Sequence, residues 1–163
     1  QELEEHGQLE NTVIVGITDH YTYGFDDVQK MMELSGVAEE FHLEKTPCFI
    51  WSANGPAMEI GKTLNTADLL PTVLNLMGID SPYHYLGQDA FDEDYVGYAL
   101  FPDGSWIVEG TLWRPEYGDN MQMLTEDAEP LTAEQMEQMN AYLVEFGQIS
   151  NLLLTTDYYK QVR

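Results

Sequence analysis

The stretch Thr12-Val-Ile-Val-Gly-Ile-Thr-Asp-His-Tyr21 decides the fold of this chain. Its run of Val and Ile is typical of a strand covered on both faces in a parallel sheet, so we expect a buried strand over residues 12–18. Asp19 and His20 follow directly. In α/β proteins, side chains at the carboxyl end of such a strand face the crevice where ligands bind. A carboxylate oxygen beside an imidazole nitrogen suits a divalent cation, so this pair is a candidate metal site.

The sequence around this stretch alternates strand and helix patterns. In order, these are a helix that starts at Asp26 or Asp27 and ends at Gly36, a strand over residues 47–51 and a helix that starts at 65–68 and ends at Gly78. Acceptor side chains suit the helix starts, and glycines suit the helix ends. This alternation predicts an α/β sheet with crossover helices and parallel strands.

The pattern changes after Gly87. Two strand-like runs, residues 95–101 and 105–113, flank the turn sequence Pro102-Asp-Gly104 and predict an antiparallel hairpin. Residues 114–130 show no clear period and are expected to form a loop.

A long helix is predicted at the C-terminal end of the sequence. Thr132 and Gln135 have the spacing of a capping box, and apolar residues recur at helical spacing to about Leu154. We therefore expect a single domain over residues 1–163, with an α/β part over residues 1–90 and a hairpin plus a helix over residues 91–163.

The charge of the chain excludes some classes of partner. Six Lys and Arg residues face 29 Asp and Glu residues, which gives a net charge of −23 and disfavours nucleic acid. No apolar run approaches the roughly 18–20 residues that span a bilayer, and no signal sequence opens the chain, so the segment is expected to be soluble. Cys48 is the single cysteine, and its apolar surroundings predict a buried, inert thiol.

Three blocks of the chain resemble a known family. They are Thr12 to Tyr21, Thr46 to Ile50, and Asp68-Leu-Leu-Pro-Thr-Val-Leu-Asn-Leu-Met-Gly-Ile79. In this order they resemble the carboxyl-terminal half of the sulfatase domain of the alkaline phosphatase superfamily. The most similar branch is the lipoteichoic acid synthase group of phosphoglycerol transferases, which carries Asp-His-Tyr at this point. Gly87-Gln-Asp89 and Leu154-Thr-Thr-Asp-Tyr-Tyr159 resemble later blocks of the family. The implied fold is the C-terminal part of an alkaline-phosphatase-like fold.

The resemblance implies an enzyme that acts on phosphate or sulfate esters, including lipid-linked ones. Such enzymes use a divalent metal, mostly Mn or Mg in this branch and Zn or Ca elsewhere, to activate a Thr, Ser or formylglycine nucleophile. Asp19 and His20 match metal ligands of the family. The nucleophile and the other ligands come from earlier in the family's domain. We therefore expect no catalytic residue in this segment, no turnover by the segment alone, and the remainder of the catalytic domain as its partner. The parent protein would lie at the extracellular face of a bacterial membrane.

The chain departs from the family pattern near the proposed ligands. Thr18 and Thr22 stand where many relatives have Gly, and Phe25-Asp-Asp27 replaces a polar loop. These changes leave the substrate preference open.

Other polar residues have two interpretations. Lys45 is a candidate for binding phosphate or sulfate, although a salt bridge is the simpler role in so acidic a chain. Asp68 could be a third ligand, but its place at a helix start favours capping. Asp89 and Asp157 are expected in turns or caps. His6, His42 and His84 have no partner at ligand spacing.

A second function belongs to another class. The chain could be a non-catalytic α/β module that binds a protein or a cell-wall polymer through an acidic or aromatic surface. The aromatic residues in question are Tyr83, Tyr85, Tyr95, Tyr98, Trp106 and Trp113. Alternating positions along strands favour packing as their role.

Overall fold

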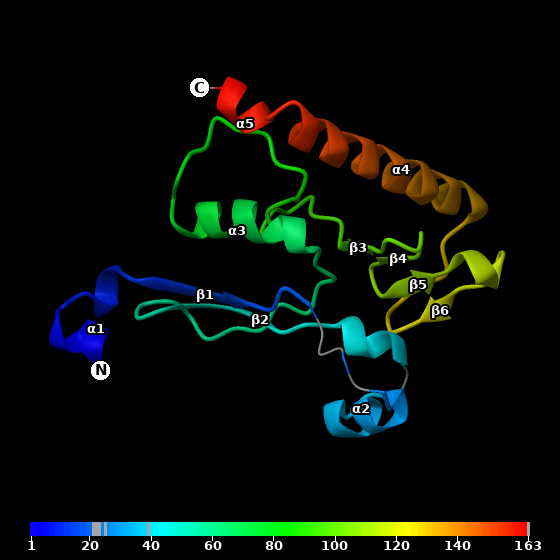
Figure 1. Cartoon of the computed structure of the whole chain (residues 1–163), viewed down its shortest axis with the longest axis horizontal. Coiled ribbons are helices and arrows are strands. Elements are labelled where there is room, and N and C mark those ends of the chain that lie inside the picture. The colour runs from blue at the N-terminus through cyan, green and yellow to red at the C-terminus, as the bar shows by residue number, and fades with distance from the viewer. Residues whose placement is uncertain (21–23, 25, 39, 163) are drawn as a thin grey trace. The chain divides into compact units, whose positions relative to one another are not determined.

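The computed structural model describes residues 1–20, 24, 26–38 and 40–162. The chain divides into two compact units, residues 1–59 and 60–163. In Figure 1 the first unit runs from blue to cyan and the second from green to red. The helix predicted to start at 65–68 and end at Gly78 was expected to cross over the same sheet as the strands of residues 12–51. It lies in the second unit. A single domain over residues 1–163 stays a prediction.

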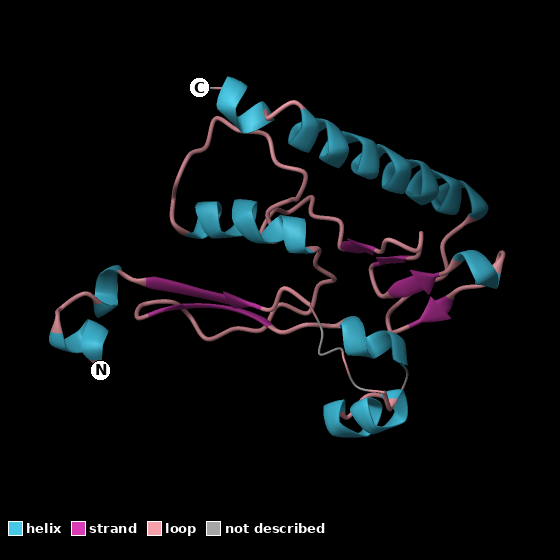
Figure 2. Cartoon of the chain, viewed as in Figure 1, coloured by secondary structure: helices cyan, strands magenta, loops and turns pink. Residues whose placement is uncertain are grey.

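The first unit contains one pair of strands and short helices (Figure 2). Its elements are α1 (Glu2–Glu5), a 3-10 turn η1 (Leu9–Asn11), β1 (Val13–Ile17), α2 (Val28–Ser35), a second 3-10 turn η2 (Glu40–Glu44) and β2 (Cys48–Ser52). Strands β1 and β2 pair antiparallel, with Val13 opposite Ser52 and Ile17 opposite Cys48. The predicted parallel arrangement is therefore wrong. Helix α2 packs against η2 and does not act as a crossover over the strands.

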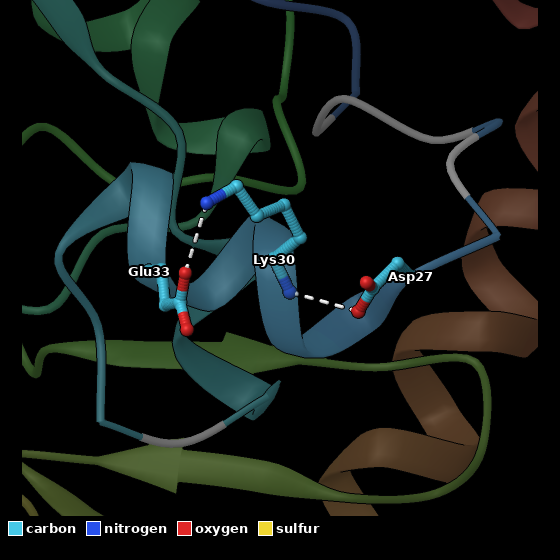
Figure 3. A network of polar contacts seen from close by, with 3 residues as sticks. All are labelled: Asp27, Lys30 and Glu33. Carbon is cyan, nitrogen blue, oxygen red and sulfur yellow. Dashed lines mark hydrogen bonds and ion pairs between the residues drawn. The ribbon is translucent and has the colours of Figure 1, made fainter.

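Helix α2 has the ends that the sequence predicted. The Asp27 carboxylate accepts a hydrogen bond from the Lys30 backbone N–H at 3.0 Å, and the Lys30 ammonium donates to Glu33 at 3.0 Å (Figure 3). Gly36 ends the helix with a φ of 68°, a left-handed conformation that costs glycine little. Met31 is the buried residue of this helix.

The second unit combines a four-stranded antiparallel sheet with helices. Its elements are η3 (Thr66–Asp68), α3 (Leu69–Leu76), β3 (Tyr98–Leu100), β4 (Trp106–Val108), β5 (Thr111–Trp113), η4 (Pro115–Tyr117), β6 (Gln122–Met123), α4 (Ala133–Thr155) and α5 (Tyr158–Gln161). The strand order is β3-β4-β5-β6. The predicted α/β class, the antiparallel hairpin and the long C-terminal helix are confirmed.

The predicted strand over residues 105–113 is in fact two strands. Glu109 and Gly110 have φ values of 44° and 81°, and together they form the tight turn between β4 and β5. Two consecutive residues with positive φ are what a type I′ hairpin turn requires. Asn-Gly and Asp-Gly are the usual pairs at this turn. The pair here is Glu-Gly, and for this reason the turn was not predicted from the sequence. The predicted loop over residues 114–130 also contains η4 and the short strand β6.

The core of the second unit lies between the sheet and α4. Tyr98, Trp106 and Val108 are buried there and pack against α4 side chains that include Met136 and Met139. The Trp106 indole N–H donates to Asn140 Oδ1 at 3.0 Å. Tyr98 and Trp106 are therefore core residues, as their strand positions predicted, and do not form an exposed glycan platform.

Candidate functional site

Asp19 and His20 lie just beyond the end of β1, after Thr18. Asp19 Oδ2 is 3.5 Å from His20 Nε2, and their side chains are 89% and 46% exposed. The extended strand brings the chain to this point, and a bend turns it at both residues. Tyr21, the third residue of the Asp-His-Tyr block, lies outside the described residues, as do Thr22 and Phe25.

The two donor atoms fit a shared metal ion. Protein nitrogen and oxygen ligands bind Zn²⁺ at about 2.1 Å, and two such bonds that meet at the tetrahedral angle put their donor atoms about 3.4 Å apart. The separation of 3.5 Å between Asp19 Oδ2 and His20 Nε2 is close to this value. One carboxylate and one imidazole also suit Mn²⁺, and the carboxylate suits Mg²⁺. Asp19 and His20 are therefore suitable ligands for a divalent metal ion, but two ligands form only part of a metal site.

A catalytic zinc site has three protein ligands. Within the described residues, no group of three or more His, Cys, Asp and Glu side chains could hold an ion. Asp19 and His20 remain predicted ligands, and the described residues supply no third ligand beside them.

Cys48 lies opposite Ile17, near the same end of the strand pair. Its side chain was predicted to be buried, but the residue is exposed. The prediction rested on the apolar residues around Cys48, but these residues are not buried either, since Phe49 is 58% exposed.

The other predicted candidate, Lys45, is exposed and lies between η2 and β2. Its backbone N–H donates to the His42 carbonyl at 3.3 Å, which closes the 3-10 turn. A role for its ammonium group in binding phosphate or sulfate stays a prediction.

Asp68 is a structural acceptor in the second unit. Its side chain is almost fully buried, at 1% exposed. One oxygen accepts from the Gln88 N–H at 2.8 Å, and the other accepts from the Asn65 N–H at 2.8 Å. The Tyr95 hydroxyl lies 2.9 Å from the second oxygen. Asp68 and Asn65 form a capping box at the start of η3, so the predicted capping role is confirmed.

The segment around Gly87 docks on this helix start. A Cβ at Gly87 would lie 2.1 Å from the Ala67 carbonyl oxygen, so only glycine allows the two backbones to approach this closely. Asp89 accepts from the Phe91 N–H at 3.0 Å and from the Asn75 amide at 2.6 Å. The Gly87-Gln-Asp89 block thus holds the chain against α3, and Asp89 has the turn role that we expected.

Tyr95 completes this buried cluster. Its hydroxyl is 2.7 Å from the Thr63 carbonyl oxygen, and the Lys62 ammonium lies 5.1 Å from the centre of its ring. Burial raises the pKa of Tyr95 above its ordinary value, and the negative charge of Asp68 raises it further. Tyr95 is therefore a neutral hydrogen-bond donor. No local sequence pattern predicts the contact between Tyr95 and Asp68, because the two residues are 27 positions apart.

Two curated proteins are similar to this chain. Lipoteichoic acid synthase 2 of Bacillus subtilis is 26% identical over 112 residues, and the lipoteichoic acid synthase of Staphylococcus saprophyticus is 28% identical over 113 residues. The chain resembles the lipoteichoic acid synthases. The resemblance predicted from the Asp-His-Tyr block and the blocks that follow it is thereby confirmed. No family model matches the chain.

The match covers different shares of the proteins compared. It includes 65–66% of this chain and 17–18% of the two relatives. The matched part of the chain therefore corresponds to less than a fifth of each relative. None of the described helices combines the length and the apolar character needed to cross a bilayer.

Proposed function

We propose that this chain supplies two metal ligands to a lipoteichoic acid synthase-like enzyme that acts on phosphate esters. The observation that carries the proposal is the sequence similarity to two lipoteichoic acid synthases, together with the placement of Asp19 and His20 at a strand end. A donor separation of 3.5 Å supports a shared ion. Mn²⁺ or Mg²⁺ is the proposed metal, with Zn²⁺ or Ca²⁺ as alternatives.

Each of the two residues has a separate task. The Asp19 carboxylate brings negative charge to the cation, and His20 must be neutral to offer a ring nitrogen as a ligand. The bound metal supplies Lewis-acid chemistry, because it neutralises charge on the oxygens of the transferred group. The nucleophile, the remaining ligands and the substrate contacts come from polypeptide outside residues 1–163. The parent enzyme is proposed to work at the outer face of a bacterial membrane.

The first test measures metal binding by the chain alone. Isothermal titration of residues 1–163 with Mn²⁺ should show weak binding at most, since two exposed ligands cannot complete a catalytic site. Asp19→Ala should abolish even this weak binding. A tight site in the isolated chain would contradict the proposal that other ligands are needed.

The second test uses a longer polypeptide that carries residues 1–163 together with the sequence its gene encodes around them. Asp19→Ala and His20→Ala should each weaken Mn²⁺ binding by at least about tenfold and abolish release of phosphoglycerol from a lipid substrate. Asp127→Ala and His6→Ala are matched controls at exposed positions and should change neither quantity.

The same experiment decides the alternative function. If the longer polypeptide binds a cell-wall polymer or a protein while the Asp19 and His20 variants leave its metal binding unchanged, the chain is a binding module and the enzyme proposal fails.

A further inference from the structure

Asn54 and Gly55 lie in an exposed turn just after the end of β2. The Gly55 backbone N–H donates to the Ser52 carbonyl at 3.2 Å, and this hydrogen bond closes a turn with Ala53 and Asn54 at its centre. Residues 53–59 are all exposed, and no helix or strand contains them. Among the residues that the structure describes, none forms a hydrogen bond with the Asn54 side-chain amide. This amide can therefore turn toward the backbone that follows it.

Glycine after asparagine favours a reaction between the two residues. Asparagine is a chemically labile residue, because the backbone nitrogen of the next residue can attack its side-chain carbonyl carbon and close a cyclic imide. A side chain on the next residue obstructs this attack, and glycine has none. A Cβ at Gly55 would lie 2.7 Å from the Ser52 hydroxyl oxygen, so this close approach also favours glycine in the turn. Asn54 thus has both the neighbour and the exposure that ring closure needs.

The pair Asp103-Gly104 shows how such a reaction is prevented. It is the other place in the sequence where Asn or Asp precedes glycine. The Ser105 N–H donates to Asp103 Oδ1 at 2.8 Å, and the Gly104 N–H donates to the Phe101 carbonyl at 3.0 Å. The hydrogen bond from Ser105 also lowers the pKa of the Asp103 carboxyl, which is therefore ionised at neutral pH and resists attack by a nitrogen. Here both the side chain and the backbone nitrogen are hydrogen-bonded, whereas in the turn after β2 only the nitrogen is.

The other asparagines of the chain all precede residues with a side chain. Asn11 is exposed, but it precedes Thr12, whose branched side chain obstructs the attack. Asn120 is exposed as well, and its amide donates to the Tyr117 carbonyl at 3.1 Å. These two residues are therefore suitable internal references for the reactivity of an exposed asparagine in this chain.

We propose that Asn54 is a site of spontaneous deamidation. The Gly55 nitrogen bonds to Cγ of Asn54, the bond from Cγ to the side-chain nitrogen breaks, and ammonia leaves with the proton from Gly55. Water then opens the imide at one of its carbonyl groups. Opening on the backbone side gives isoaspartate, in which the main chain runs through the former side chain. Opening on the other side gives aspartate.

Both products change the turn after β2. Each adds one negative charge to a chain whose net charge is −23. Isoaspartate also lengthens the main chain of the turn by a methylene group, which shifts the Gly55 N–H relative to the Ser52 carbonyl. The change falls in the segment between β2 and residue 60, where the second unit begins. Ageing of the protein therefore produces turns that differ in charge and in length.

Incubation of residues 1–163 at mildly alkaline pH, followed by peptide mapping with mass spectrometry, tests the proposal. Asn54 should yield both aspartate and isoaspartate, whereas Asn11 and Asn120 should stay intact over the same period. The rate should rise about tenfold per pH unit, because the Gly55 nitrogen must lose its proton before it attacks. If Asn54 yielded aspartate alone, water would hydrolyse the amide directly, and the proposal would be wrong. An intact Asn54 would overturn it as well.

A comparison with the chain unfolded in urea tests the contribution of the structure. Folding should change the rate at Asn54 by less than about threefold, because an exposed turn opens at little cost in free energy. Folding should slow the conversion of Asp103 to isoaspartate by at least about tenfold, because its hydrogen bond with Ser105 must break first. If folding protected Asn54 as strongly as Asp103, the proposal would fail.

Variants in the turn sharpen the test. Asn54→Gln should form no isoaspartate over the same period, because its side chain would have to close a larger ring. Gly55→Ala should slow deamidation of Asn54 by at least about tenfold, because a side chain obstructs the attack. Asn120→Gln is the matched control and should leave the rate at Asn54 unchanged. All three positions are exposed, so each variant should keep the far-ultraviolet circular dichroism of the wild type. A wild-type rate in Gly55→Ala would contradict the proposed attack.

The longer polypeptide that contains residues 1–163 should also deamidate at Asn54. The reaction there should again give both aspartate and isoaspartate. Protection of Asn54 in the longer polypeptide would show that residues 53–59 are covered in that protein, and it would overturn the proposal.

Discussion

Residues 60–163 enclose a core, whereas residues 1–59 leave most of their strand residues exposed. In the second unit Trp106 and Leu112 are 0% exposed, and α4 covers the sheet. In the first unit, Met31 is the one buried hydrophobic residue among those described. The two units have similarly apolar strands, so the difference lies in what covers the strands. An apolar strand pattern thus indicates that a strand is suited to burial. It does not show that the layers that would cover the strand are present in the same chain.

The largest expected effect compares two tryptophans. Trp106→Ala should destabilise the second unit by about 3–5 kcal/mol, because it empties a buried site and removes the hydrogen bond to Asn140. Trp51→Ala, at a half-exposed position on β2 in the first unit, should change this free energy of unfolding of the second unit by less than about 0.5 kcal/mol. Urea unfolding followed by circular dichroism measures both. Similar losses for the two variants would remove the contrast between the units.

The second effect concerns the buried carboxylate of Asp68. Asp68→Ala should cost about 2–4 kcal/mol, since it leaves the Gln88 and Asn65 N–H groups and the Tyr95 hydroxyl without this acceptor. Asp127→Ala, at an exposed position in the same unit, is the control and should change the free energy of unfolding by less than about 0.5 kcal/mol. If Asp68→Ala lowered the free energy of unfolding only slightly, the hydrogen bonds to Asp68 would not stabilise the fold as we propose.

Much of the local structure could be predicted from the sequence, because its causes are local. Asp27 and Gly36 bound α2, and Thr132 with Gln135 forms the capping box that starts α4. Strand direction could not be predicted in this way. Alternating strand and helix patterns do not say whether a connection crosses over a sheet, and β1 and β2 proved antiparallel.

Only part of the candidate site could be predicted from the sequence. The position of Asp19 and His20 at a strand end follows from the apolar run before them, and the structure adds the separation of their donor atoms. The Asp68 cluster joins residues up to 32 positions apart, which no local pattern encodes. The burial of β1 was predicted from its composition, and the prediction was wrong for this chain because the described residues supply no covering layer.

The smallest expected effect is a dependence on pH. The Ser105 N–H donates to Asp103 at 2.8 Å and lowers the pKa of this carboxyl below its ordinary value of 3.8, with a smaller contribution from Arg114. A lowered pKa stabilises the folded state above pH 3.8, and this contribution is lost as the pH falls through the folded-state value. Asp103→Asn should therefore be less stable than the wild type near pH 6, and the difference should vanish at strongly acidic pH. Urea unfolding curves at a series of pH values measure this difference in stability, and Asp127→Asn is the control.

The contrast between the units is tested most directly by separating them. Residues 60–163 and residues 1–59 are expressed apart and unfolded with urea, and circular dichroism follows each. The second unit should show one cooperative transition, because its core is enclosed by its own sheet and by α4. The first unit should lose its structure gradually, without a folded baseline, because its ribbon lacks a covering layer. A cooperative transition of residues 1–59 alone would contradict the account, since it would show that β1 and β2 need no further polypeptide.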